Sequence, residues 1–167
     1  MKLSRASVYA FYGLTVLAEK ADGGYVPLSE IHERYGVPEK HLAKIFQVLV
    51  KAGILESARG VNGGFALARP ATTISPLDVV KAIEGPIDEA GCLLLQEKCA
   101  SDGVCRINAV WRRAQHAMLT VLRQATLADM VGDPKRRLHP PPAGVERAPK
   151  DELAQGHPVA VGRITRT

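Results

Sequence analysis

The feature that most constrains the fold of this chain is residues 28–69, where two short helical patterns precede two short strand patterns. Apolar residues recur at helical spacing from Leu28 to Tyr35 and again from about Pro38 to Ala52. A glycine follows each pattern, and glycine readily ends a helix. We therefore predict two helices around a turn at Gly36, in contact through Ile31, Val37, Leu42 and Ile45. Such a pair serves in DNA-binding units, but also as plain protein core.

The residues that follow Gly53 indicate a β-hairpin. Ile54 to Ala58 and Phe65 to Arg69 are the predicted strands, on either side of Arg59-Gly60-Val61-Asn62-Gly63-Gly64. Glycines let backbone amides approach a phosphate, and an arginine at the base of a hairpin can enter a narrow minor groove. An ordinary hairpin with a solvated arginine is the alternative. Because this hairpin directly follows the helix pair, we interpret it as the wing of a winged helix-turn-helix unit.

Two further helices are predicted to flank this unit. Ser4 is a suitable N-cap for a helix that runs to about Lys20, with apolar residues on more than one face. The start of the chain also has features of a secretory signal, but polar and aromatic residues interrupt its apolar stretch, which favours a permanent helix. Ser75-Pro76-Leu77-Asp78 resembles a capping box and predicts a short support helix that ends at Gly85.

A long amphipathic helix is predicted toward the C-terminal side, over roughly 30 Å. Its apolar residues recur at intervals of three and four, and they are Ile107, Val110, Trp111, Ala114, Met118, Val121, Leu122 and Ala125. So short a chain offers little other surface against which this stripe can be buried. That favours pairing with the same helix of a second subunit, and packing only within its own subunit is the alternative.

The predicted fold class is mainly α with a small β-hairpin. A winged helix-turn-helix domain covers residues 1–86, a cysteine-bearing loop residues 87–104, and a long dimerisation helix with a closing turn residues 105–132. Residues 133–167 are rich in proline, contain no aromatic side chain and are expected to be disordered. No apolar run is long enough to span a membrane.

The charge balance permits nucleic acid as a partner. Lys and Arg number 22 against 17 Asp and Glu, for a net charge of +5. The segment from Pro38 to Arg69 contributes to this excess, with basic side chains at Lys40, Lys44, Lys51, Arg59 and Arg69 against acidic ones at Glu39 and Glu56. No catalytic constellation, phosphate-binding loop or dinucleotide fingerprint is recognisable, so the sequence does not predict an enzyme.

Cys92, Cys99 and Cys105 are the three cysteines of the chain, in a C-x6-C-x5-C arrangement. Their polar neighbours distinguish them from core cysteines, and their odd number in a short stretch fits a reducing cytoplasm. Thiolates in a loop can hold one iron–sulfur cluster, whereas a structural zinc site usually has C-x2-C pairs and four ligands. Redox-active thiols without a metal are the alternative.

Residues 1 to about 133 resemble the Rrf-two (Rrf2) family of winged-helix transcriptional regulators. The resemblance rests on Met1-Lys2-Leu3-Ser4, on Gly53-Ile54-Leu55 after the second helix, on the wing through Phe65 and on the three cysteines. It implies a homodimer on a partly palindromic, double-stranded DNA operator, with recognition helices about 34 Å apart in neighbouring major grooves. It also implies an iron–sulfur cluster, of the 4Fe-4S or 2Fe-2S type, on the cysteines.

The resemblance further assigns residues to the DNA. Glu39, Lys40, His41 and Lys44 would face the major groove, with Lys40 and His41 on base edges and Lys44 on a phosphate or a guanine. Arg59 and Asn62 would contact DNA from the wing.

The chain departs from the family at the fourth ligand of the cluster. Asn108 and Val8 stand where relatives have a histidine or a carboxylate. The expected function is that of a dimeric transcriptional regulator that senses iron, redox state or nitric oxide through a labile cluster. A metal-free thiol switch is one alternative, and an iron–sulfur carrier or electron-transfer module is another.

Overall fold

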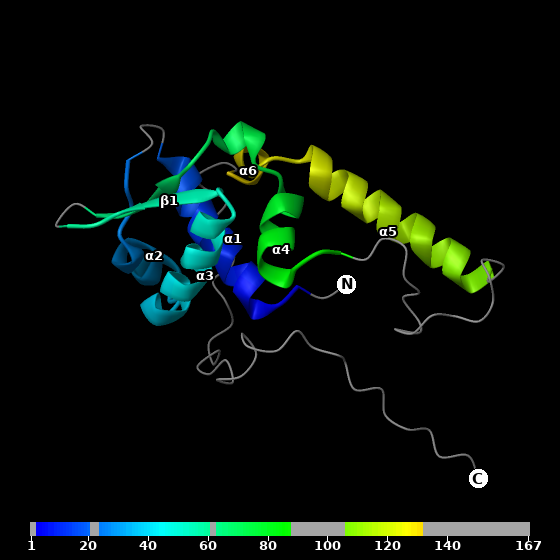
Figure 1. Cartoon of the computed structure of the whole chain (residues 1–167), viewed down its shortest axis with the longest axis horizontal. Helices are drawn as coiled ribbons and strands as arrows, with labels where there is room; N and C mark the ends of the chain where they lie inside the picture. Colours follow the sequence, from blue (N-terminus) through cyan, green and yellow to red (C-terminus); the bar gives the residue numbers. More distant parts are fainter. Residues whose placement is uncertain (1–2, 21–23, 61–62, 88–105, 132–167) are drawn as a thin grey trace, which may run out of the picture.

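The computed structural model describes residues 3–20, 24–60, 63–87 and 106–131, with the side chains of residues 106 and 107 left out. Its fold is mainly α with one β-hairpin, which confirms the predicted class (Figure 1). The elements, in chain order, are α1 (Arg5–Glu19), α2 (Leu28–Tyr35), α3 (Glu39–Lys51), β1 (Leu55–Ala58), β2 (Gly64–Leu67), the 3-10 turn η1 (Ala71–Thr73), α4 (Pro76–Glu84), α5 (Arg106–Gln124) and α6 (Leu127–Met130).

The helix ends follow the local signals that predicted them. Ser4 Oγ accepts a hydrogen bond from the backbone N–H of Ser7, which caps α1. Ser75 and Asp78 form a full capping box at the start of α4. Gly36 ends α2 in the left-handed conformation, with a φ of 68°, so the chain can turn sharply into α3. The helix pair is therefore built as predicted.

Helix α1 lies at the centre of the molecule and packs against α2, α3, α4, α6 and β2. It approaches α3 closely at Gly13, where an added Cβ would lie 2.4 Å from Cζ of the fully buried Phe46. The helix pair contributes to the same core through the four apolar residues that the sequence singled out, all of them buried: Ile31, Val37, Leu42 and Ile45. The predicted contact positions of the pair are confirmed.

The hairpin is an antiparallel pair in which Leu55 lies opposite Leu67 and Ala58 opposite Gly64. Its strands are shorter than predicted. Ile54 precedes β1 because its N–H bonds to Leu49 O and prolongs the turn that ends α3. Arg69 lies beyond β2. Val26 adds a single bridge to the hairpin, since its N–H and carbonyl both bond to Phe65, at 2.9 and 3.0 Å.

Helix α5 projects away from the winged part of the molecule (Figure 1). It packs against α4, where Leu119 is almost fully buried. Apolar side chains on other parts of its surface stay exposed, with exposed fractions of 67% at Val110, 49% at Trp111 and 64% at Val121. Leu119 is not a member of the predicted stripe, and no described residue of that stripe is buried within one subunit. None of the described helices is long and apolar enough to cross a membrane.

The chain returns to the core after α5. Leu127 in α6 is fully buried, and its N–H donates to the carbonyl of Ile74 at 2.8 Å. Helix α6 also packs on α1 and η1. Both ends of α5 are therefore connected to segments that pass close to the winged unit, α4 before it and α6 after it.

The close approach of α1 to α3 gives a direct test of the packing. Gly13→Ala should lower the free energy of unfolding by about 1–3 kcal/mol, because Phe46 is enclosed and has little room to move aside. Urea unfolding measures this change. An increase in stability, by up to about 1 kcal/mol as helix propensity alone would give, would contradict the described packing.

Candidate nucleic-acid interface

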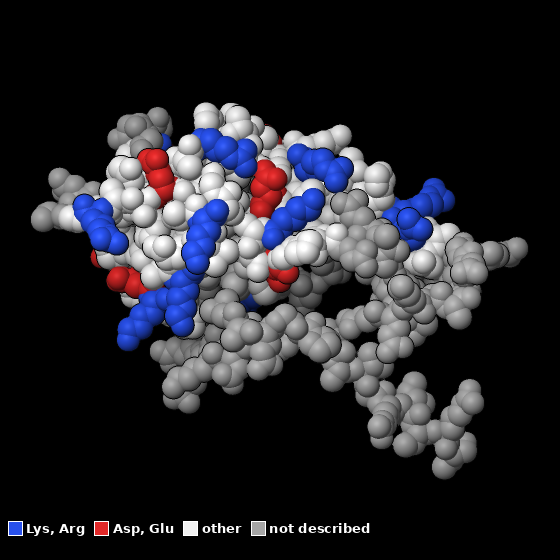
Figure 2. Space-filling view, viewed as in Figure 1, with Lys and Arg blue, Asp and Glu red and all other residues white. Residues whose placement is uncertain are grey.

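Helix α3 has one face in the core and the opposite face in solvent. Its buried residues are Leu42, Ile45, Phe46 and Leu49. Lys40, Lys44, Gln47 and Lys51 follow one another at intervals of four, three and four, so they form a single stripe on the far side. All four are exposed, and Lys and Arg side chains gather over α3 in Figure 2. We call this set the α3 stripe.

The structure sorts the four residues that were predicted for the major groove. Lys40 and Lys44 lie in the middle of the exposed face, where a helix in a groove would make its closest approach. Glu39 and His41 flank the stripe on opposite sides, and His41 is half-buried. The sequence interpretation missed Gln47, although its spacing from Lys40 and Lys44 was enough to find it.

The turn between α2 and α3 is held by side-chain and backbone contacts together. The N–H of Gly36 donates to the carbonyl of His32 at 2.7 Å, and His32 Nδ1 lies 3.0 Å from the carbonyl of Val37. Val37 itself is fully buried. The direction in which α3 leaves the turn is therefore fixed by the core and by the imidazole of His32.

The hairpin lies against α3 through β1 and carries Arg59, which is exposed directly after that strand. Asn62, the other residue predicted for this wing, lies outside the described residues. Gly60 has a φ of 111°, a backbone conformation that favours glycine. The α3 stripe and Arg59 thus belong to two elements that are in direct contact.

The two glycines before Phe65 are required by close backbone contacts. A Cβ on Gly63 would lie 2.5 Å from the carbonyl oxygen of Ala58, and a Cβ on Gly64 would lie 2.3 Å from that of Val26. Both distances are shorter than real Cβ contacts. The Gly-Gly pair therefore serves the geometry of the hairpin and its bridge to Val26.

Tyr25 stands beside the hairpin and was not singled out from the sequence. Its hydroxyl donates to Glu56 Oε1 on β1 at 2.9 Å, and this hydrogen bond raises the pKa of Tyr25 above its ordinary value. Glu56 contributes one of the two acidic side chains of the basic segment. The Tyr25 hydroxyl thus holds the Glu56 carboxylate in a hydrogen bond at the side of the hairpin.

The candidate metal ligands Cys92, Cys99 and Cys105 lie outside the described residues. The segment that contains them joins the end of α4 to the start of α5, and Cys105 immediately precedes Arg106 in the sequence. The described ranges contain no cluster of three or more His, Cys, Asp or Glu side chains that could hold a metal.

Two observations fit an iron–sulfur group next to α5. Three thiolates are a donor set that suits such a cluster. Asn108, three residues after Cys105, has a buried Oδ1 atom without a hydrogen-bond partner among the described residues. A buried amide oxygen of this kind usually has a partner, so one is expected from outside the described residues.

Known proteins resemble this chain over most of its described part. A family model named Rrf2, described as an iron-dependent transcriptional regulator, matches residues 3–133. The structure of CymR, the global cysteine regulator of B. subtilis, is similar with a TM-score of 0.69 and 27% identity, over 78% of this chain and 96% of that one.

Two further solved structures match the same share of this chain. IscR of T. potens has a TM-score of 0.63 and 31% identity, over 78% of this chain and 86% of that one. The oxidized form of S. aureus CymR has a TM-score of 0.62 and 27% identity, over 78% of this chain and 96% of that one.

The Gly-Gly pair of the hairpin supports a second stability test. Gly64→Ala should destabilise the protein by about 1–3 kcal/mol, because the new methyl group overlaps the carbonyl of Val26. Ser57→Ala, at an exposed residue of the facing strand, is the control and should stay near wild-type stability. Thermal unfolding and amide exchange of Phe65 measure the effect, and a Gly64→Ala protein as stable as the control would refute the close approach.

Proposed function

The chain belongs to the Rrf2 family of transcriptional regulators, and on that premise we propose that it is a homodimer that binds a specific DNA operator under the control of its three cysteines. The observation that carries the proposal is the α3 stripe, a set of exposed lysines and a glutamine opposite the core and beside a glycine-rich hairpin. Rrf2 proteins are regulators and not enzymes.

We assign the α3 stripe to the major groove, which is about 12 Å wide and admits one α-helix. Lys40 at the start of α3 is suited to base edges, with His41 beside it, and Lys44 to a phosphate or a guanine. Glu39, at the flank, can accept from the amino group of a cytosine. Arg59 and Asn62 would contact the adjacent minor groove from the wing.

The partner in the dimer is a second copy of α5. This helix has 19 residues and is about 28 Å long, so it offers a continuous seam. Val110, Trp111 and Val121 are exposed on it although they are apolar, and pairing with an identical helix would cover them. Binding to two neighbouring major grooves requires two copies of α3, and a dimer paired through α5 supplies them.

We assign the control of DNA binding to an iron–sulfur cluster on Cys92, Cys99 and Cys105. The description of the family model as iron-dependent and the 31% identity to IscR support this assignment. When bound, the cluster supplies metal–thiolate bonds that oxygen, nitric oxide or iron shortage can break. Asn108, near the third cysteine, could offer iron only an amide oxygen, which is a weak ligand, and this fits a labile site.

The segment with the cysteines starts from a firmly held point. Glu84, the last residue of α4, accepts hydrogen bonds from Ser4 N at 3.0 Å and from Ser7 Oγ at 2.5 Å. Burial alone would raise the pKa of Glu84, but these hydrogen bonds outweigh it and hold the pKa below its ordinary value. The carboxylate therefore ties the end of α4 to the start of α1.

Occupancy of the cysteines, which lie between α4 and α5 in the sequence, can change the position of α5 relative to this anchored end of α4. A shift of the dimer from 1% to 99% competent for DNA needs about 5.5 kcal/mol of differential binding, which metal–thiolate bonding exceeds. We propose that cluster loss alters the spacing of the two α3 helices in this way.

A metal-free thiol switch is the second candidate. It is favoured by the similarity to S. aureus CymR, one structure of which is an oxidized form. An iron–sulfur carrier or electron-transfer module would also use the cysteines, but it would leave the α3 stripe and the wing without a role.

The cysteine assignment predicts the behaviour of three single variants. Cys92→Ala, Cys99→Ala and Cys105→Ala, purified without oxygen, should each lose the visible absorbance and the bound iron and sulfide of the wild-type protein. Each should also change affinity for a DNA fragment selected from the genome with the wild-type protein.

The outcomes separate the candidates. One alternative outcome is a wild-type protein that contains no iron and whose DNA affinity changes with oxidant, with this response lost in the variants. That result would favour the thiol switch over the cluster. Retention of absorbance and iron in all three variants would contradict both assignments.

The DNA assignment predicts a graded loss of affinity. Lys44→Ala and Arg59→Ala should each weaken operator binding, and each lost phosphate contact should reduce the slope of log K against log salt by about 0.9. Lys81→Ala, an exposed lysine on α4, removes the same charge away from the interface and serves as control. Equal losses in all three variants would indicate a nonspecific charge effect and contradict the interface.

A further inference from the structure

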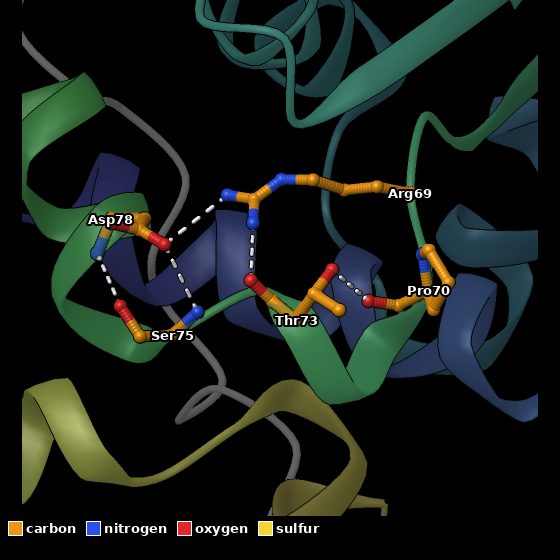
Figure 3. Close-up of polar contacts among 5 residues, drawn as sticks. All are labelled: Arg69, Pro70, Thr73, Ser75 and Asp78. Atoms are coloured by element: carbon orange, nitrogen blue, oxygen red, sulfur yellow. Dashed lines mark hydrogen bonds and ion pairs between the residues drawn. The ribbon is translucent and has the colours of Figure 1, made fainter.

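Arg69 belongs to the basic segment of the chain, but its side chain is turned toward the protein. Its Nη1 donates to the carbonyl oxygen of Thr73, and its Nη2 lies 3.2 Å from Asp78 Oδ2 (Figure 3). The planar guanidinium thus reaches two acceptors at once, one in η1 and one at the start of α4. Unlike the lysines of the α3 stripe, Arg69 has its donors committed within the chain.

Asp78 uses the same oxygen for the cap of α4. Its Oδ2 also accepts from Ser75 N at 3.1 Å, and Ser75 Oγ accepts from Asp78 N at 3.1 Å. Burial raises the pKa of Asp78, but the hydrogen bonds from Ser75 and Arg69 outweigh it and hold the pKa below its ordinary value. The carboxylate is therefore ionised at neutral pH and joins Arg69 to the first turn of α4.

The segment between Arg69 and α4 is braced at Thr73 as well. Both the N–H and the hydroxyl of Thr73 donate to the carbonyl of Pro70, each at 2.8 Å. Arg69 follows β2 by two residues, and α4 packs against α1, α3 and α5. Arg69 therefore links the base of the wing to the helix on which α5 rests.

We propose that Arg69 is a positioning residue that sets the direction of the wing relative to α4, so that Arg59 reaches the DNA. This inference rests on the proposed function. Arg69 acts through the wing and makes no DNA contact of its own. The pair is partly exposed, with exposed side-chain fractions of 38% for Arg69 and 45% for Asp78, so it contributes little to global stability.

The test is a double-mutant cycle on operator affinity, measured by fluorescence anisotropy with a fragment that the wild-type protein binds. Arg69→Ala should weaken binding about tenfold, and Arg69→Lys should recover only part of it, because an ammonium group lacks the planar fork with which the guanidinium reaches both acceptors. In an Arg59→Ala background, Arg69→Ala should weaken binding less than twofold.

Two further variants separate positioning from contact. Asp78→Asn keeps an oxygen for the cap of α4 and leaves Arg69 in place, but it should reproduce most of the loss of Arg69→Ala. Glu19→Gln is the matched control, because it weakens the ion pair between Glu19 of α1 and Arg34 of α2, at 2.9 Å, which includes no residue of the wing or of α4. It should leave operator affinity unchanged.

Three results would overturn the inference. They are equal losses from Arg69→Ala with and without Arg59, wild-type affinity in Asp78→Asn, and no effect of Arg69→Ala. Amide exchange of the free protein adds a readout that does not need DNA, since Arg69→Ala should speed exchange at Phe65 and Leu67 and leave α2 unchanged. If no fragment binds the wild-type protein, the proposed function fails, and unchanged exchange would then overturn the positioning role by itself.

Discussion

The structure depends most on the enclosure of one aromatic ring. Phe46 is fully buried between α1 and the hairpin, against the backbone of Gly13 on one side and edge-on to Phe65, at 5.0 Å between ring centroids, on the other. An edge-on aromatic pair adds roughly 0.5–1.5 kcal/mol beyond the buried area. Because Phe46 belongs to α3 and Phe65 to β2, one contact sets the placement of both elements that present the basic surface.

Around this contact the molecule divides into a well-packed winged unit and a projecting helix. The winged unit is braced by polar contacts at three places: the turn at His32, the junction of Glu84 with α1, and the link from Arg69 to α4. Helix α5 leaves part of its apolar surface exposed. Such a division suits a regulator in which the winged unit acts as one rigid body.

Much of the fold could be predicted from the sequence, because it is encoded by local signals. Gly36 and the Ser75 capping box marked helix boundaries correctly, and the spacing of apolar residues identified the buried face of α3. The contact of Gly13 with Phe46, the bridge of Val26 to Phe65 and the buried position of Leu119 could not be predicted, since each depends on elements far apart in the chain.

The candidate site was predictable in part for the same reason. Helical spacing placed Lys40 and Lys44 on one face, whereas the inward turn of Arg69 depends on Asp78 and could not be inferred from its charge. The roles of Asn62 and of the cysteines, which lie outside the described residues, stay predictions. In the function proposed above, occupancy of the cysteines controls how the α3 stripe and the wing meet DNA. The most direct measurement follows operator affinity in one oxygen-free preparation while its iron is removed stepwise by a chelator. If the cysteines act in this way, affinity changes in proportion to the iron lost per dimer, and constant affinity from fully loaded to iron-free protein would contradict that role.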